Sequence, residues 1–267
     1  MLKRYRAIFI SDLHLGTRRA QARALLDFLR GSDSDYLYLV GDVIDIWSLR
    51  RKWFWTQDHN DVIQKLLRKA RRGTRVIYVP GNHDEYCRDF CNHHFGNLEV
   101  AIDAVHVTAA GKRYLVLHGD KFDHVVCVAP WVAKLGDAAY ELAMDLNLLV
   151  TRVRRWLGLP YWSLSAYLKQ RVKRAVEFIS NYETAVVRDA RHRSCCGVIC
   201  GHIHAAGDRE IDGIHYLNTG DWVESCTALV EHMDGRLEII RWQDADGSTR
   251  VQPANALGEF ELPAMTP

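Results

Sequence analysis

Five short polar clusters contain residue types that bind divalent metal ions. The clusters are Asp12-Leu13-His14, Gly41-Asp42-Val43-Ile44-Asp45, Gly81-Asn82-His83-Asp84, His118-Gly119-Asp120 and Gly201-His202-Ile203-His204. Their ligating side chains would be Asp, His and Asn without any Cys, which suits ions such as manganese and differs from a structural zinc site. Two such ions held together lower the pKa of bound water and clamp the attacking and leaving oxygens of a displacement reaction. The clusters therefore predict metal-assisted hydrolysis at one shared site.

Each of these clusters follows a segment that is predicted to be a buried strand. Residues 5–10, 36–40 and 75–79 are rich in β-branched and aromatic residues, as buried strands are. Amphipathic stretches at 18–30 and 58–72 predict helices between them. This order of strand, loop and helix predicts parallel strands, whose carboxyl ends converge on one crevice. The glycines inside the clusters let the backbone turn sharply beside a crowded site.

The sequence after residue 97 has the texture of short alternating strands. Such strands are predicted at 99–108, 113–117, 196–200, 206–218, 226–232 and 236–242. Together with the earlier strands and helices, they favour an α/β fold in which two packed sheets carry helices on their outer faces.

A helical insertion, residues 122–193, interrupts this β-rich half. Apolar residues recur at steps of three and four over 135–153 and nearly so over 168–186, which predicts two amphipathic helices. Gly158-Leu159-Pro160 marks the turn between them. We expect one catalytic domain, residues 1–243, that contains this insertion, followed by a loose surface tail at 244–267. The two helices form either a hairpin packed on itself or a cap over the active site.

The composition is that of a globular enzyme without a strong electrostatic preference for one partner. The chain has 267 residues, of which 48% are hydrophobic and 25% charged, and its formal net charge is +2. This balance argues against nucleic acid as the partner. No apolar run approaches the roughly 18 residues of a membrane span. The N-terminus faintly resembles a signal peptide, but cleavage there would remove Asp12 and His14.

The seven cysteines are an odd number in a chain that is long enough to bury a large core, so a disulfide framework is neither implied nor needed. We expect them to be buried thiols that act as small apolar residues, because the paired spacing of a zinc site is missing. A reducing, cytoplasmic compartment fits this pattern best.

The order of the polar clusters resembles that of the calcineurin-like metallophosphoesterase family across residues 12–204. The family pattern D-x-H, G-D-x-x-D, G-N-H-D, H and G-H-x-H is present in full. The resemblance implies a sandwich of two mixed β-sheets flanked by helices, and a site with two divalent metal ions that hydrolyses a phosphate ester or anhydride with a metal-bound hydroxide. It also implies a set of ligands: Asp12, His14 and His204 for one metal, Asn82, His118 and His202 for the second, and Asp42 as the bridge between them.

His83 and Asp84 are predicted to be catalytic residues that do not bind metal. The resemblance implies that His83 stabilises the phosphoryl oxygens or protonates the leaving group, and Asp84 is close enough in sequence to orient its ring. Asp45 and Asp120 are expected to hydrogen-bond the loop backbone. The segment 218–222 is either a strand-ending turn or a wall of the substrate pocket. The remaining histidines are expected to be structural or exposed.

Within this family, the sequence more closely resembles the UDP-2,3-diacylglucosamine pyrophosphatases of lipid A synthesis. The signals are the SDLHL run at 11–15, the GDVIDIW run at 41–47 and the NTGDW run at 218–222. The resemblance implies two manganese ions and a lipid-linked nucleotide diphosphate that is cleaved to UMP and 2,3-diacylglucosamine 1-phosphate. The basic and aromatic residues of the insertion would suit a lid that grips acyl chains and makes peripheral contact with the inner, anionic face of the membrane.

One residue departs from the pattern of the lipid A enzymes, whose third cluster usually reads Gly-Asn-Arg-Asp. Here His83 occupies the Arg position, and an imidazole can act as an acid whereas a guanidinium can only donate hydrogen bonds. This leaves open a phosphodiesterase or phosphomonoesterase that acts on another nucleotide, on nucleic acid or on a phosphoprotein. A non-catalytic scaffold of the same fold would typically lack some ligands or the loop histidine, and this chain retains all of them.

Overall fold

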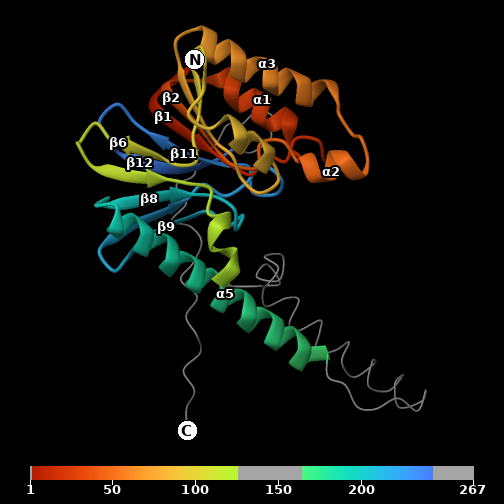
Figure 1. The fold of residues 1–267 in the computed structure, drawn as a ribbon, viewed down its shortest axis with the longest axis vertical. Helices are drawn as coiled ribbons and strands as arrows, with labels where there is room; N and C mark the ends of the chain where they lie inside the picture. Colours follow the sequence, from red (N-terminus) through yellow and green to blue (C-terminus); the bar gives the residue numbers. More distant parts are fainter. Residues whose placement is uncertain (1, 126–163, 243–267) are drawn as a thin grey trace. The chain divides into compact units, whose positions relative to one another are not determined.

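The computed structural model describes residues 2–125 and 164–242 of the chain. The chain divides into two compact units, one formed by residues 1–120 with 187–267 and the other by residues 121–186. The helices and strands of both units are coloured by sequence in Figure 1, which labels most of them. All the predicted metal ligands belong to the first unit, so the candidate site can be described within that unit alone.

Within the described residues, the larger sheet of the first unit has seven strands in the order β12-β11-β1-β2-β3-β5-β4. The strands are β1 Lys3–Ile10, β2 Ser32–Val40, β3 Arg75–Val79, β4 His94–Phe95, β5 Leu98–Val100, β11 Thr227–Glu231 and β12 Leu237–Arg241. Strands β1, β2, β3 and β5 run parallel, whereas β11 pairs antiparallel with β1 and the sheet is therefore mixed. The strands predicted at 5–10, 36–40 and 75–79 are confirmed as β1, β2 and β3.

The smaller sheet has the order β6-β7-β8-β10-β9 in the part of the chain that the structure describes. Its strands are β6 Ala104–Val107, β7 Arg113–Val116, β8 Gly197–Cys200, β9 Gly207–Ile211 and β10 Ile214–Asn218. Strands β7, β8 and β10 are parallel neighbours, and the two outer strands are antiparallel. The prediction of two mixed sheets is therefore confirmed.

Two segments that were each predicted as one strand are in fact two strands. Residues 99–108 are divided between the sheets, because β5 belongs to the larger sheet and β6 to the smaller. Residues 206–218 fold back as the β9–β10 hairpin. Asp212 and Gly213 at its tip have φ values of 49° and 75°, and a two-residue type I′ turn requires positive φ at both positions.

Helices α1 Ala22–Gly31, α2 Ile46–Arg51 and α3 Gln57–Arg71 follow β1 and β2 in the chain. Helix α3 begins where the Thr56 side chain accepts a hydrogen bond from the His59 N–H, and its last turn carries three basic residues that oppose the helix dipole. Helix α1 begins four residues after the predicted start at residue 18. Helix α2 was not predicted, because its six residues include no buried side chain and hence no amphipathic pattern.

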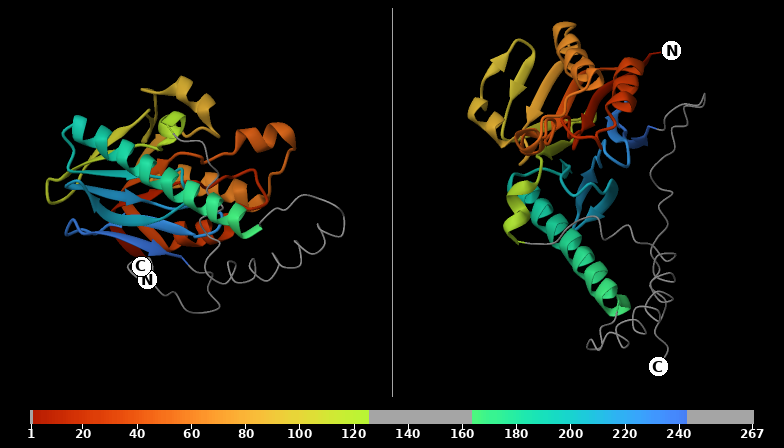
Figure 2. Two further views of the ribbon diagram at one scale, coloured as in Figure 1. Left: turned by 90° about the horizontal axis from the view of Figure 1, so that it is seen from below. Right: turned by 90° about the vertical axis from the view of Figure 1, so that its right-hand side faces the viewer.

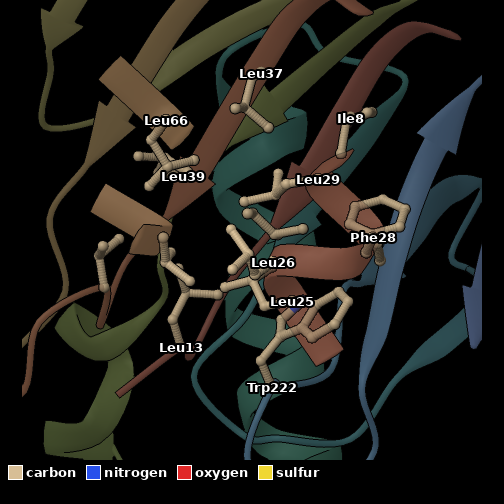
Figure 3. Close-up of a cluster of buried hydrophobic side chains, with 14 of the residues drawn as sticks. Ile8, Leu13, Leu25, Leu26, Phe28, Leu29, Leu37, Leu39, Leu66 and Trp222 are labelled. Carbon is tan, nitrogen blue, oxygen red and sulfur yellow. The ribbon is translucent and has the colours of Figure 1, made fainter. Parts of the chain in front are cut away.

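Side chains of the larger sheet alternate between two hydrophobic cores. Ile8 and Ile10 of β1 face a core that also contains Leu25 and Leu29 of α1, as Figure 3 shows for several of its members. Ala7 and Phe9 of β1 face the opposite core, which the smaller sheet covers. The period of two along a strand produces this layering. Two views in Figures 1 and 2 show α1 and α3 on one face of the larger sheet and the smaller sheet on the other.

The described part of the second unit consists of residues 121–125, from the 3-10 helix Asp120–Val125, and residues 164–186, from helix α5 (Leu164–His192). The helix predicted over 168–186 is confirmed as part of α5. Phe178 and Tyr182 are buried on this helix, with stacked rings 6.4 Å apart. The helix predicted over 135–153, the turn at 158–160 and the tail at 244–267 lie outside the described residues.

Candidate metal centre

The predicted ligands lie at the carboxyl ends of neighbouring strands. Asp12, Asp42 and Asn82 follow β1, β2 and β3 of the larger sheet, while His118 and His202 follow β7 and β8 of the smaller one. Because these strands are parallel neighbours within their sheets, their loops emerge at the same edge. The topology thus brings together residues that are far apart in the sequence, as the hydrogen bond between the His202 N–H and Asp12 Oδ2, 190 residues apart, shows.

Asp12, His14 and His204 form the first group of side chains that could hold a metal ion. Each offers one ligand atom, and these atoms lie within 4.8 Å of one another. Nε2 of His204 is 3.2 Å from Asp12 Oδ1 and 3.3 Å from Nε2 of His14. Asp12 is fully buried. A buried carboxylate that faces two imidazole nitrogens is a suitable cage for a divalent cation.

Asp42, His118 and His202 form the second group. Asp42 Oδ2 lies 3.5 Å from His118 Nε2 and also 3.7 Å from His14 Nε2 of the first group. One carboxylate oxygen therefore faces both groups, as a bridging ligand must. His118 Nδ1 is 2.9 Å from the carbonyl oxygen of Val40, and a hydrogen bond there fixes the ring and leaves Nε2 for a metal.

Two buried oxygens indicate that the residues fit a metal ion. Asn82 Oδ1 and Asp12 Oδ1 are inaccessible to solvent, and neither accepts a hydrogen bond from another described residue. Buried acceptors in folded proteins are almost always satisfied. Coordination of a cation would satisfy both. Asn82 also precedes His83, whose backbone N–H donates to Asp42 Oδ1 at 2.9 Å, so the loop that carries Asn82 is tied to the bridging aspartate.

Backbone strain is concentrated in this site. Asp12, His14, Asp42, His202 and His204 all have positive φ, between 46° and 71°. Residues other than glycine rarely adopt this left-handed conformation, and each residue that does so costs of the order of 1 kcal/mol or more. Hydrogen bonds from the Asp12 N–H to the Gly41 carbonyl and from the His14 N–H to the Asp42 carbonyl hold two of them in place. Such strain is typical of functional loops.

Two glycines permit the close approach of the loops, as the sequence predicts. At Gly41, whose φ is +82°, an added Cβ would lie 2.1 Å from Nδ1 of His118. At Gly81 an added Cβ would lie 2.3 Å from Oδ1 of Asp42 and 2.7 Å from the His118 ring. Neither position can therefore accept a side chain without displacing a predicted ligand.

The charges in the site call for cations. Burial lowers the pKa of His118, but the charges of Asp42 and Asp12 outweigh this effect and raise it to about 10. Burial alone would raise the pKa of Asp12 and Asp42, yet the neighbouring histidines hold both carboxyl pKa values below their usual range. The buried carboxylates thus attract positive charge strongly, and divalent ions would supply it.

His83 lies beside these groups, and its ring partner is Asp45. His83 Nδ1 is 3.1 Å from Asp45 Oδ1, and the other carboxylate oxygen of Asp45 is 3.2 Å from His14 Nδ1. Asp45 also caps helix α2 by accepting the Ser48 N–H. The indole of Trp47 packs on the His83 ring with centroids 4.4 Å apart. Burial lowers the pKa of His83, but the hydrogen bond to Asp45 and the charge of Asp42 raise it overall.

Asp84 does not orient the His83 ring as the sequence suggested. Its carboxylate accepts hydrogen bonds from the Gly81 and Val43 N–H groups at 2.6 and 2.7 Å, and from the Tyr78 hydroxyl. These contacts join the loop after β3 to the loop after β2. Asp84 therefore positions Asn82 and His83 through the backbone, while Asp45, which the sequence suggested for loop stabilisation alone, contacts the ring directly. The GDVID run contained this signal, but sequence distance favoured Asp84.

The segment 218–222 is a strand-ending turn that supports the histidine loop. The Asn218 side chain donates to the Gly201 carbonyl at 2.8 Å, and the Trp222 N–H donates to the Asp12 carbonyl at 3.1 Å. Trp222 is buried in the core under α1. The carboxylate of Asp221 caps the turn by accepting the N–H groups of Val223 and Glu224. The turn therefore supports the loops that carry His202 and Asp12.

The other histidines and the cysteines have roles that the structure makes plain where it describes them. His106 is buried against Glu231 and Tyr38, and His215 lies between Tyr114 and Asp208. The six cysteines of the described segments form no disulfide bond with one another. Cys195 and Cys200 are buried as expected, whereas Cys196 is exposed and the other three are partly exposed. The candidate metal groups among the described residues contain no cysteine.

A cavity of about 400 Å³ opens beside the first metal group. His14, Asp45 and His204 line it, together with residues 17–19 of the turn that follows His14. In the part of the chain that is described, no helix combines the length and apolar character needed to cross a membrane.

Comparisons with known proteins show what this chain is similar to. A family model for calcineurin-like phosphoesterases matches residues 5–206. A UDP-2,3-diacylglucosamine hydrolase of Azotobacter vinelandii is 35% identical over 233 residues, which cover 80% of this chain and 90% of the relative. A protein of the same name from Aeromonas salmonicida is 27% identical over 247 residues, covering 84% and 88%. Among solved structures, the phosphoesterase Yfce of E. coli is 16% identical with a TM-score of 0.44, covering 89% of this chain and 93% of that one.

Proposed function

Because the chain belongs to the calcineurin-like phosphoesterase family and is a metal-dependent hydrolase, we propose that it cleaves the diphosphate of UDP-2,3-diacylglucosamine. The products would be UMP and 2,3-diacylglucosamine 1-phosphate. The observation that carries the chemistry is the meeting of the two ligand groups at Asp42, with His83 beside them. The names of the relatives support the choice of substrate.

In this proposal, seven side chains hold two divalent ions. They are Asp12, His14 and His204 for the first ion, Asn82, His118 and His202 for the second, and Asp42 for both. When bound, the ions supply Lewis acidity that activates water near neutral pH and offsets the charge of the phosphate. We propose manganese as the native metal, because nitrogen and oxygen donors without thiolate suit it.

His83 supplies the proton in the proposed mechanism. Asp45 contacts Nδ1 of the ring, which leaves Nε2 as the atom that can give a proton to the leaving oxygen. The raised pKa keeps the ring protonated at a higher pH than that of a free imidazole, as a general acid near neutral pH requires. Trp47 packs against the ring, with the two centroids 4.4 Å apart. Asp84 holds the loop that carries His83 against the loop of Asp42.

The domain assignment and the membrane contact are part of the same proposal. Residues 1–243 would form the catalytic domain, and the insertion at 122–193 would act as an acyl-chain lid that contacts an anionic membrane from the cytoplasmic side. The seven Lys and Arg residues of the segment 152–174 support this surface contact. Flotation with vesicles that contain phosphatidylglycerol tests it. Neutralising the basic residues of 152–174 should weaken the binding. Unchanged binding by such a variant would contradict the membrane contact.

The decisive assay is UMP release by the purified protein with manganese and UDP-2,3-diacylglucosamine. The Asp42→Ala variant is the blank, and Asp58→Ala, which alters an exposed acid in the first turn of α3, is the matched control. Release by the wild-type and control proteins, and none by the blank, would support the proposal. Turnover of a generic phosphodiester without any release of UMP would retain the metal chemistry and reject the lipid substrate.

A further inference from the structure

The turn between β1 and α1 brings two arginines to a cavity that metal ligands also line. Arg18 and Arg19 line the cavity of about 400 Å³ together with His14, His204 and Asp45. Both belong to a turn that the sequence predicted as the start of a helix, and helix α1 begins only at Ala22.

This turn is held firmly to the predicted ligand His14. The Thr17 hydroxyl donates to the His14 carbonyl at 2.9 Å, and the Thr17 N–H donates to the same oxygen at 3.2 Å. Gly16 has a φ of +104°, and an added Cβ would lie 2.7 Å from the Leu49 side chain of α2. The backbone of this turn is therefore fixed relative to His14 by hydrogen bonds and by close packing, and the exposed side chains of Arg18 and Arg19 extend from it.

The two guanidinium groups have no carboxylate partner among the described residues. The contact that the structure gives for Arg18 is with the face of Phe54, whose ring centroid is 5.5 Å from the guanidinium carbon. Asp45 also faces the cavity, but its carboxylate is engaged by His14, His83 and the Ser48 N–H. Two cations are thus left to interact with a ligand, and guanidinium groups bind phosphate oxygens in bidentate fashion.

We propose that Arg18 and Arg19 bind the second phosphate of a diphosphate substrate, the one that is not attacked at the metal centre. The inference rests on the proposed metal site and deepens it. It assigns the preference for a diphosphate over an ester with one phosphate to a turn outside the metal-binding clusters. The cavity volume lies in the range of small-molecule sites, so it can contain a phosphate and part of the group attached to it.

The test compares two soluble inhibitors of the hydrolysis of bis(4-nitrophenyl) phosphate by the manganese-loaded protein. UDP-glucose has its charge on two linked phosphates, whereas UMP has a similar total charge on one. The proteins compared are the wild type, Arg18→Ala, Arg19→Ala, the double variant and Arg23→Ala, an exposed arginine on α1 that serves as the control. The rise in unfolding temperature that each inhibitor causes gives a second readout, which does not depend on turnover.

The double variant should raise the inhibition constant of UDP-glucose by about tenfold to a hundredfold, since each charge-assisted hydrogen bond contributes about a tenfold effect. The constant for UMP should rise by no more than about threefold, and the thermal shifts should follow the same order. Arg18→Lys should recover part of the loss. Equal rises for both inhibitors, no change for either, or wild-type protein that UDP-glucose does not inhibit would each overturn the proposal.

This test separates the inference from the proposed lipid substrate. If UDP-diacylglucosamine is not cleaved but the arginine variants weaken the binding of UDP-glucose selectively, the diphosphate site stands and the acyl-chain assignment fails. If UMP is released from the lipid and the double variant binds both inhibitors as the wild type does, the arginine inference alone fails.

Discussion

Replacing Asp45 by asparagine removes one charge from a carboxylate that has three partners. Oδ1 accepts the Ser48 N–H at 2.7 Å and lies 3.1 Å from His83 Nδ1, while Oδ2 lies 3.2 Å from His14 Nδ1. Asparagine keeps the shape and an acceptor for Ser48, so the start of helix α2 is retained. The loss therefore falls on the two histidine rings, one a predicted ligand and the other the predicted acid.

The size of the effect follows from these contacts. A hydrogen bond to a charged group contributes about 1.5–3 kcal/mol, and a correctly placed general acid contributes about 10²- to 10⁴-fold to a rate. We predict that kcat falls about 10²-fold for a phosphodiester with a poor leaving group, which corresponds to about 2.7 kcal/mol. The fall should be about tenfold with the good leaving group 4-nitrophenolate, because that group needs little protonation. Metal affinity should weaken by about tenfold through His14.

The pH dependence of kcat shows whether Asp45 raises or lowers the pKa of His83. Burial lowers the pKa of His83, and Asp45 with Asp42 raises it above its ordinary value. An acid is active below its pKa, so activity should decline as the pH rises through the raised value. Asp45→Asn should move that decline to lower pH. In the His83→Ala background, Asp45→Asn should cause a much smaller additional loss, since the two residues act together. An equal loss in both backgrounds would refute the assigned partnership.

Three further changes test other parts of the structure. Gly81→Ala should reduce kcat by at least about 10²-fold, because its Cβ would meet Asp42 and His118. Gly31→Ala is the control, since its Cβ would lie 3.6 Å from the nearest atom, in Trp242. Unchanged turnover in Gly81→Ala would contradict the packing. Glu231→Gln should lower the free energy of unfolding by about 1.5–3 kcal/mol, measured in urea, because the fully buried carboxylate lies 2.7 Å from both Arg6 and His106. Burial raises the pKa of Glu231, but these contacts lower it overall. The stability that Glu231 contributes is therefore complete above about pH 4.3 and is lost as the pH falls through the lower folded-state pKa. A Glu231→Gln variant with the same acid sensitivity as the wild type would refute this. Chelation with EDTA should abolish turnover, with recovery on adding manganese, and full activity after chelation would exclude a metal-dependent site.

The sequence predicted the parts of the fold that are governed by burial. The carboxyl-terminal halves of β1 and β2, and β3 after Arg75, are apolar runs that are covered on both faces, and their pattern is recognisable without any tertiary information. The loops that follow them contain the polar clusters, so the edge of the sheet that carries the site was also predictable. The fold was harder to predict where short strands change sheets, as at 99–108.

What the sequence did not reveal depends on contacts between distant residues. Sequence distance placed Asp84 next to His83, yet the backbone directs the Asp84 carboxylate to the loop after β2 and brings Asp45 to the ring. Helix α2 is too short and too exposed to produce a periodic signal. The turn at Arg18 and Arg19 was predicted to be helical because its composition suits a helix, whereas Gly16 and the hydrogen bonds of Thr17 shape it as a turn.

The central claim is that seven side chains hold two metal ions that share Asp42. Elemental analysis of the manganese-loaded protein tests it most directly, with turnover of a phosphodiester measured on the same samples. We predict about two manganese ions per chain for the wild type and for His83→Ala, and fewer than about one, with no turnover, for Asp42→Ala. A wild-type protein that retains at most one ion, or an Asp42→Ala variant that keeps two ions and full turnover, would contradict the account.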